Sequence, residues 1–242
     1  MTILLEVRDL TRAFGALRAV AGISFSVREG ELLGLIGPNG AGKSTLYNLI
    51  AGALVPTSGE IRFKGTSVAG WKPYHAARAG VARTFQIPKA YRHLSVIENV
   101  ALSALQHDRT VKAARASAQA VLAEVGLAAY AEAPVSILTA GLLKRLEVAR
   151  ALALRPSLVL FDEIVAGLTP SEVKGMTALV AGLSARGITV IWVEHVLYAI
   201  MTTAPRIMVL HRGDLIADGA PEKLAKDSAV IKAYLGEEMS LA

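Results

Sequence analysis

The sequence contains no cysteine, which excludes disulfide bonds and thiolate metal sites. Long hydrophobic runs are also missing, since the apolar runs at 158–161 and 188–193 end in acidic residues and no run reaches the ~20 residues that span a bilayer. The N-terminus carries Glu6 and Asp9 and has no basic segment followed by an apolar one, so we expect no signal peptide. Together these absences favour a cytosolic protein.

Basic residues are not concentrated in any part of the chain. The 242 residues include 26 Lys and Arg against 20 Asp and Glu, a net charge of +6, and no run of four basic residues occurs. Such a charge can serve nucleic acid or an anionic membrane surface. Because the residues are scattered, an ordinary solvated surface is the better explanation. The composition, 53% hydrophobic and 19% charged, is that of a globular protein.

Strand-like and helix-like segments alternate along the chain, which predicts an α/β fold with a mainly parallel sheet. Residues 3–28 and 58–65 read as short strands. Three apolar runs are typical of strands buried on both faces: residues 32–37, 158–161 and 188–193. From about residue 88 to 157 the chain is Ala-rich and helical, so we expect a helical subdomain inserted into one domain that spans residues 1–242.

Several short patterns predict where helices and turns begin. Ser95-Val-Ile-Glu98 is a capping box, and Thr169-Pro170-Ser171-Glu172 combines a cap, a first-turn proline and a glutamate three residues after the cap. An Arg-Gly-Asp turn between two apolar runs predicts a hairpin over 206–219. Residues 230–236 end the chain as a short helix.

The segment from Gly37 to Ser44, GPNGAGKS, matches the phosphate-loop pattern G-x-x-x-x-G-K-[ST], and it lies between a buried strand and a helix-like stretch. Glycines let backbone N–H groups surround phosphate oxygens, and the helix N-terminus adds a positive dipole end. Lys43 reaches the β- and γ-phosphates and Ser44 binds Mg²⁺ in such loops. The predicted nucleotide-binding residues are Asn39, Gly40, Gly42, Lys43, Ser44 and Thr45.

The buried strand at 158–161 ends in two acids, Asp162 and Glu163. A carboxylate on a strand beside a phosphate loop is the expected partner of Mg²⁺, so we assign Asp162 to the metal's water shell. Glu163 is the better general base, because a base must reach the water that attacks the γ-phosphate. Without the phosphate loop, two adjacent acids would more simply cap a strand and face solvent.

Two further polar residues follow apolar stretches. His195 comes after the strand at 188–193 and Glu194, at the sheet edge where ligands bind in such folds, and could donate a hydrogen bond to the γ-phosphate. Gln86 closes the stretch Arg83-Thr-Phe-Gln86, and an amide there can ligate Mg²⁺ and orient water. A single His is more often structural, so both assignments depend on the phosphate loop.

Taken in chain order, these features resemble the nucleotide-binding subunit of ABC transporters over nearly the whole chain. The resemblance rests on Phe14, GPNGAGKST at 37–45, Gln86, the turn at 138–142, Asp162 with Glu163, and His195. It implies a P-loop NTPase of the ABC ATPase type, with a mainly parallel core sheet, an N-terminal antiparallel β subdomain and an inserted helical subdomain. It also implies ATP and Mg²⁺ as cofactors, and Phe14 stacking on adenine with Val20 beside it, although Phe14 could also be a core residue.

By resemblance, the segment Leu138–Leu142, here called the signature turn, corresponds to the family motif usually written LSGGQ. Thr139 keeps the hydroxyl and Gly141 is kept, whereas Ala140 replaces the first glycine and Leu142 replaces the glutamine. In the family this turn begins a helix and caps the γ-phosphate of ATP bound to the other subunit, which needs backbone N–H groups rather than a catalytic side chain. Ile164 stands where the family usually has proline.

A finer resemblance is to the ATPases of branched-chain amino acid importers, whose relatives also carry other small polar or carboxylate substrates. It rests on residues 82–86, 145–152, 166–172 and 230–236. Within it, Gly167 and Leu168 occupy the family's dimer-contact loop. The implied partners are two transmembrane permease subunits, a second ATPase subunit (the same chain or a paralogue) and, indirectly, an external solute-binding protein. The implied location is the cytoplasmic face of the inner membrane, and no nucleic acid is expected.

The resemblance implies that residues 87–100 meet the permease, with Tyr91, His93 and Leu94 as surface contacts, although an ordinary solvated loop is the alternative. Two other functions stay open. A soluble ABC ATPase acting on ribosomes or nucleic acid usually has two nucleotide domains or a coiled-coil insert, and 242 residues hold neither. A regulatory subunit with weak hydrolysis is suggested by Leu142, because this residue loses the amide of the family motif.

Overall fold

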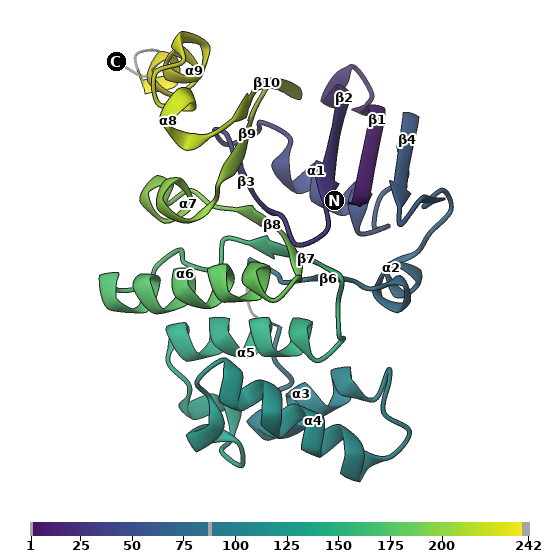
Figure 1. Ribbon diagram of the computed structural model, residues 1–242, viewed down its shortest axis with the longest axis vertical. Helices are drawn as coiled ribbons and strands as arrows, with labels where there is room; N and C mark the ends of the chain where they lie inside the picture. The colour runs from purple at the N-terminus through teal and green to yellow at the C-terminus, as the bar shows by residue number, and fades with distance from the viewer. Residues whose placement is uncertain (1, 87–88, 239–242) are drawn as a thin grey trace.

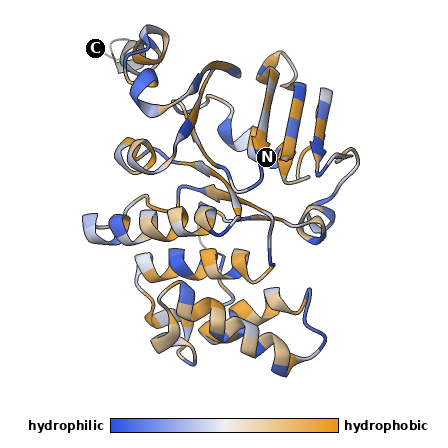
Figure 2. Cartoon of the chain, viewed as in Figure 1, coloured by the Kyte–Doolittle hydropathy of each residue, from blue (hydrophilic) through white to orange (hydrophobic). Residues whose placement is uncertain are grey.

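The computed structural model describes residues 2–86 and 89–238 (Figure 1). Its N-terminal part is an antiparallel sheet of four strands. Their order is β2 (Leu17–Arg28), β1 (Ile3–Phe14), β4 (Ser58–Phe63) and β5 (Thr66–Ser67). Figure 2 shows alternating hydrophobic and hydrophilic bands along β1 and β2, as expected for a sheet with one buried face. The antiparallel N-terminal part of the expected fold is confirmed.

The second sheet carries the residues predicted to bind nucleotide. Its order is β10 (Asp214–Gly219), β9 (Arg206–His211), β3 (Leu32–Ile36), β8 (Thr189–Val193), β7 (Leu158–Asp162) and β6 (Val81–Arg83). All neighbours pair in parallel except β9 and β10, which form the predicted hairpin. The expected mainly parallel core sheet is therefore confirmed.

Residues of the central strands alternate between two hydrophobic cores, one on each face of the sheet. On β7, Val159 and Phe161 belong to the core shared with the helices of the 96–185 region, and Leu158 and Leu160 belong to the core beneath the N-terminal sheet. Trp192 of β8 lies fully buried in the first core. Both faces being covered explains why these strands read as unbroken apolar runs.

Helices cover the core sheet and extend away from it. The helices between β3 and β6 are α1 (Lys43–Ile50) and α2 (Pro73–Ala79), and the inserted ones between β6 and β7 are α3 (Val96–Ala104), α4 (Val111–Glu124) and α5 (Ala140–Leu152), with short 3-10 turns at Ala128–Tyr130 and Val135–Ile137. The later helices are α6 (Pro170–Ala185), α7 (Leu197–Thr203), α8 (Pro221–Leu224) and α9 (Ser228–Glu238). In Figure 1, α3, α4 and α5 lie at the end of the molecule away from β1 and β2.

Both predicted capping boxes form. Ser95 accepts from the Glu98 N–H at 3.3 Å while the Glu98 carboxylate accepts from the Ser95 N–H at 2.8 Å. Thr169 and Glu172 make the same exchange at the start of α6. The sequence patterns do not predict α2 or β6, because these elements are short and have no strong periodicity. No helix among the described residues is both long and apolar enough to cross a membrane.

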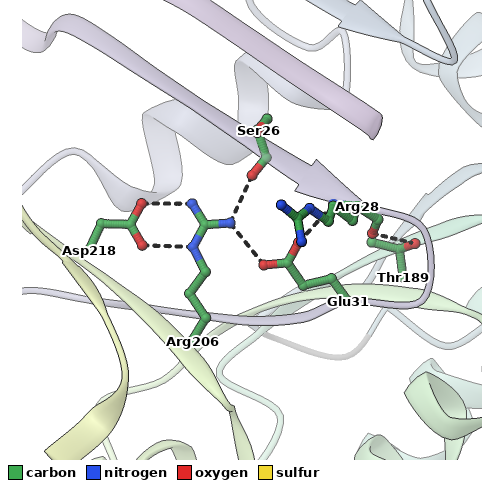
Figure 3. A network of polar contacts seen from close by, with 6 residues as sticks. All are labelled: Ser26, Arg28, Glu31, Thr189, Arg206 and Asp218. Atoms are coloured by element: carbon green, nitrogen blue, oxygen red, sulfur yellow. Dashed lines mark hydrogen bonds and ion pairs between the residues drawn. The ribbon is translucent and has the colours of Figure 1, made fainter. Parts of the chain in front are cut away.

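The two sheets are joined at the end opposite the phosphate loop by Arg206, the first residue of β9 (Figure 3). Its guanidinium pairs with both carboxylate oxygens of Asp218 at 2.7 Å, and it also donates to Glu31 at 2.8 Å and to the Ser26 carbonyl at 2.9 Å. These contacts, chiefly the hydrogen bonds with Asp218, raise the pKa of Arg206 above its ordinary value. The network links β9 to β10, β2 and the turn before β3.

Candidate nucleotide-hydrolysis site

The phosphate loop joins the end of β3 to the start of α1, and its shape depends on glycine. Gly42 has φ +104°, and a Cβ there would lie 2.1 Å from the Ala19 carbonyl oxygen. A Cβ on Gly37 would lie 2.2 Å from the Leu210 carbonyl oxygen. Helix α1 has no side-chain cap and no acid in its first turn. Its first N–H groups and its dipole are therefore directed at the loop, as an anion site requires.

Lys43 lies inside this loop and is only 6% exposed. Its Nζ donates to the carbonyl oxygens of Gly37, at 2.6 Å, and Pro38, at 2.9 Å. The ammonium is thus held at the concave side of the loop, on partners that an anionic phosphate could replace. This geometry fits the predicted contact between Lys43 and a nucleotide phosphate.

The three residues predicted to act in hydrolysis lie together at the carboxyl ends of the strands. Gln86 Nε2 donates to Glu163 Oε2 at 2.7 Å, and His195 Nε2 lies 3.0 Å from Glu163 Oε1. Each carboxylate oxygen of Glu163 therefore has its own partner, one from the segment after β6 and one from the segment after β8. The parallel order β8-β7-β6 places these ends side by side.

Asp162 ends β7 and is 9% exposed. Burial, and then the negative charge of Glu163, raise the pKa of Asp162. A carboxylate in this position would be stabilised by a cation. Among residues 2–86 and 89–238 no cluster of three or more His, Asp or Glu side chains could hold a metal. The predicted set of Ser44, Gln86 and Asp162 instead offers separate oxygen ligands, which suits Mg²⁺ that keeps waters and binds substrate phosphates.

The predicted adenine contacts differ in exposure. Phe14 is 45% exposed at the end of β1, and the Arg12 guanidinium lies 4.6 Å from its ring centroid. Val20 is fully buried in the core. Only Phe14 of this pair therefore presents a surface on which a base could stack, whereas Val20, a residue of β2, is packed in the core.

The signature turn begins α5, as predicted. Thr139 is the N-cap, and its hydroxyl accepts from the Leu142 N–H at 3.3 Å. Gly141 is buried against α6, because a Cβ there would lie 2.2 Å from Glu172 Oε1. Leu142 packs against the hydrophobic core, which gives a physical reason for an apolar residue where the family motif has glutamine. Thr139 and Ala140 are exposed.

Comparison with known protein families gives two matches. The family model "ABC transporter" matches residues 20–166, and "Branched-chain amino acid ATP-binding cassette transporter" matches residues 215–239.

The chain belongs to the ABC transporter family.

Its relatives include the high-affinity branched-chain amino acid transport ATP-binding protein BraF of Pseudomonas aeruginosa, 37% identical over 97% of this chain and 98% of the relative. LivG of Escherichia coli, with the same description, is 35% identical over the same shares. Among solved structures, a nucleotide-free ATP-binding cassette from an ABC transporter has TM-score 0.88 and 27% identity, covering 96% of this chain and 99% of that one. An ADP-bound cassette gives TM-score 0.89 and 27% identity, covering 98% and 100%. As a member of the ABC transporter family, the chain is an ABC-type ATPase with the expected fold.

The predicted dimer-contact loop, at Gly167 and Leu168, lies between Glu163 and α6. Gly167 has φ +75° with open space around it, so this turn is exposed. A groove beside the loop is lined by Val165, Leu168, Val173 and Tyr198, among others, and Tyr198 is 74% exposed. The structure therefore leaves an accessible, partly apolar surface at the predicted dimer contact.

The segment predicted to meet a permease is described from Lys89 onward, and Ile87 and Pro88 lie outside the described residues. Tyr91 and His93 are exposed, and Leu94 is half-buried. The buried Asn99 fixes the segment's shape, because it accepts from the Tyr91 N–H at 2.8 Å and donates to the Tyr91 carbonyl at 3.1 Å. A neighbouring groove between α2, β6 and α5 is lined by residues that include Phe85, Ser103, Arg150 and Leu154.

Sequence reasoning missed several residues around this ABC ATPase site. Tyr47 is fully buried and donates from its hydroxyl to the Ile191 carbonyl at 2.7 Å, which ties α1 to β8. Thr84 accepts from the Asp162 N–H at 3.1 Å. Tyr234 of α9 hydrogen-bonds with the backbone of Gly37, and burial raises its pKa to about 12. Lys144 donates to the Glu163 carbonyl oxygen, and Glu194 accepts from the Val165 N–H at 2.7 Å. The sequence carries no local signal for these contacts, because every one joins distant segments.

Proposed function

We propose that this chain is the ATP-hydrolysing subunit of an importer for branched-chain amino acids or a related small polar or carboxylate substrate, and that residues 1–242 form one nucleotide-binding domain. The observation that carries the proposal is the placement of Glu163 between Gln86 and His195 at the sheet edge beside the phosphate loop. The names of BraF and LivG, and the match of residues 215–239, support the cargo class.

Each side chain has one task in hydrolysis. Lys43 and the N–H groups of the phosphate loop bind and neutralise the substrate phosphates. Glu163 accepts the proton of the attacking water, while Gln86 and His195 hold the two oxygens of its carboxylate. Ser44, Gln86 and Asp162 would hold Mg²⁺, which would help to neutralise the negative charge of the phosphates. Phe14 offers a ring for the adenine.

A second subunit completes the site in this proposal. Thr139 and Gly141 of one chain cap the γ-phosphate of ATP bound to the other, through the N–H groups at the start of α5. The Thr139 cap and the buried Gly141 support this, because they hold the exposed helix start in a defined shape. ATP then favours the closed dimer because its γ-phosphate contacts both halves, and hydrolysis removes that preference. Gly167 and Leu168 contact the partner between the two sites.

The permease partners are proposed to dock on the Lys89–Val100 segment and on the groove beside it at Phe85 and Arg150. Both lie next to Gln86, so docking can reach the hydrolysis site. In this proposal the chain is bound through its partners at the cytoplasmic face of the membrane. Pull-down of the tagged chain from native membranes should recover two polytopic membrane proteins. Recovery with ribosomes or nucleic acid and no membrane protein would favour the soluble alternative.

The substitution Glu163→Gln tests the hydrolysis mechanism. It preserves the side-chain size and removes the base, so ATP should still bind while turnover falls by about 100-fold or more. ATP should also hold the variant as a dimer, measured by size-exclusion chromatography with light scattering. Unchanged ATPase activity would refute the assignment of Glu163. A wild-type chain that binds ATP and does not hydrolyse it within its complex would support the regulatory alternative.

A further inference from the structure

The backbone at Glu163 is held in an unfavourable conformation. Its φ is +51°, in the left-handed region that costs a residue with a Cβ about 1 kcal/mol or more. Such a conformation persists only where the surrounding contacts determine it. One of these contacts is the Glu163 N–H, which donates to the Val193 carbonyl of β8 at 3.0 Å.

Lys144 provides the second contact, and it comes from the helix that follows the signature turn. Its Nζ donates to the Glu163 carbonyl oxygen. The Lys144 side chain is half-buried. Burial lowers the pKa of Lys144, and the negative charges of Glu194, Glu163 and Asp162 offset only part of this decrease. The ammonium therefore lies near the acids of the hydrolysis site. Among the described residues, no hydrogen bond joins it to the phosphate loop.

Glu194 provides the third contact and is only 1% exposed. Its Oε1 accepts from the Val165 N–H at 2.7 Å and from Trp192 Nε1 at 3.2 Å. Its Oε2 has no hydrogen-bond partner among the described residues. Burial raises the pKa of Glu194, and the positive charge of Lys144 lowers it in part. The peptide units from Glu163 to Val165 are thus fixed by β8, by α5 and by a buried acid.

Helix α5 also contacts the far end of the same segment. Gly141 in the first turn of α5 lies against Glu172 Oε1, and Glu172 closes the capping box of α6 with Thr169. The first two turns of α5 therefore contact the chain on both sides of the dimer-contact loop, at Glu163 and at Glu172. A displacement of the signature turn would be transmitted to both positions.

We propose that Lys144 is a positioning residue that joins the signature helix α5 to the backbone of Glu163, so that engagement of the signature turn by the second subunit's ATP stabilises the general base of the same chain in its working conformation. The proposal rests on the proposed function for the identity of the ligand at the signature turn. The contact between Lys144 and Glu163 stands independently of it.

The test compares three variants of the full-length protein: Lys144→Met, Lys144→Arg and, as a control, Lys112→Met on the exposed face of α4. Lys144→Met keeps the length of the side chain and removes the donor. We expect kcat to fall about 10-fold with KM for ATP changed less than about twofold, because a positioning role affects turnover and not binding. Lys144→Arg should restore kcat to within about threefold, since it also donates. Lys112→Met should match the wild type.

A second measurement does not depend on turnover. Amide hydrogen exchange of the peptide that covers Glu163–Val165 should be faster in Lys144→Met than in the wild type and Lys112→Met. Unchanged kcat and unchanged exchange in Lys144→Met would overturn the proposal. A loss of kcat that Lys144→Arg fails to restore would also overturn it, and so would a loss of kcat with an equal loss of ATP affinity. If the wild type shows no turnover in its complex, the proposed function fails. The exchange measurement would still show whether Lys144 stabilises the backbone at Glu163.

Discussion

The phosphate loop and the segment from Glu163 to Leu168 reach their shapes by different means. The loop depends on glycines whose backbone conformations no other residue adopts easily, at Gly37, Gly40 and Gly42. The Glu163 segment has a comparable left-handed residue without glycine, and Lys144, Glu194 and Val193 hold it from three separate elements. A loop shaped by its own residues can be recognised in a sequence, and one held by distant partners cannot.

The largest effect is expected from Gly42→Ala in the phosphate loop. Alanine would be strained at φ +104°, and its Cβ would lie 2.1 Å from the Ala19 carbonyl, a backbone atom that cannot rotate away. Combined strain and displacement of about 3 kcal/mol should weaken ATP binding by about 100-fold or more, measured by isothermal titration calorimetry.

Gly40→Ala is the matched control for this change. Gly40 has φ +78°, and nothing lies within 4 Å of the position its Cβ would take. Only the strain of about 1–2 kcal/mol remains, so the affinity for ATP should fall by about 5- to 30-fold. Equal losses in the two variants would mean that the contact with Ala19 does not matter for the loop.

A smaller effect is expected from Gly141→Ala at the signature turn. The new Cβ would displace the Glu172 carboxylate, which accepts from Thr169 at 2.9 Å, so α6 should lose its capping box. Loss of the cap should reduce the free energy of unfolding by about 1 kcal/mol, measured by urea denaturation. In a Glu172→Ala background the same glycine substitution should cost almost nothing. Additive losses in the double variant would contradict the contact.

The sequence predicts most of the fold because the relevant patterns are local. Apolar runs mark β3, β7 and β8, and capping boxes mark the starts of α3 and α6. The short α2 and β6 carry neither kind of pattern, and they are stabilised by packing against the rest of the chain. The phosphate loop is also a local pattern, because the spacing of its glycines and of Lys43 identifies it directly in the amino-acid sequence.

The site is predictable only where a residue belongs to a motif or ends a strand. Glu163 and His195 follow strands that apolar runs predict, and Gln86 closes a short apolar stretch. Parallel pairing brings the three together. Lys144 and Glu194 could not be assigned in this way. Lys144 reads as an ordinary basic residue on a helix, and Glu194 reads as a strand-end acid facing solvent, although it is 1% exposed. Their roles depend on contacts with Glu163 and Val165, which only the folded chain reveals.

A pH dependence is expected of the Glu163 segment and not of the phosphate loop. Burial raises the pKa of Glu194 from 4.5 to about 7. Between these values the folded chain keeps a proton that the unfolded chain has released, so this group makes the free energy of unfolding fall as pH rises, by at most about 1.4 kcal/mol per unit. Glu194→Gln cannot titrate, so its stability should fall less steeply between about pH 5 and 7, measured by urea denaturation at each pH. Gly40→Ala alters no titrating group and should keep the wild-type slope. Equal slopes in Glu194→Gln and the wild type would mean that Glu194 is ionised in the folded protein throughout this range, with Lys144 fully compensating its burial.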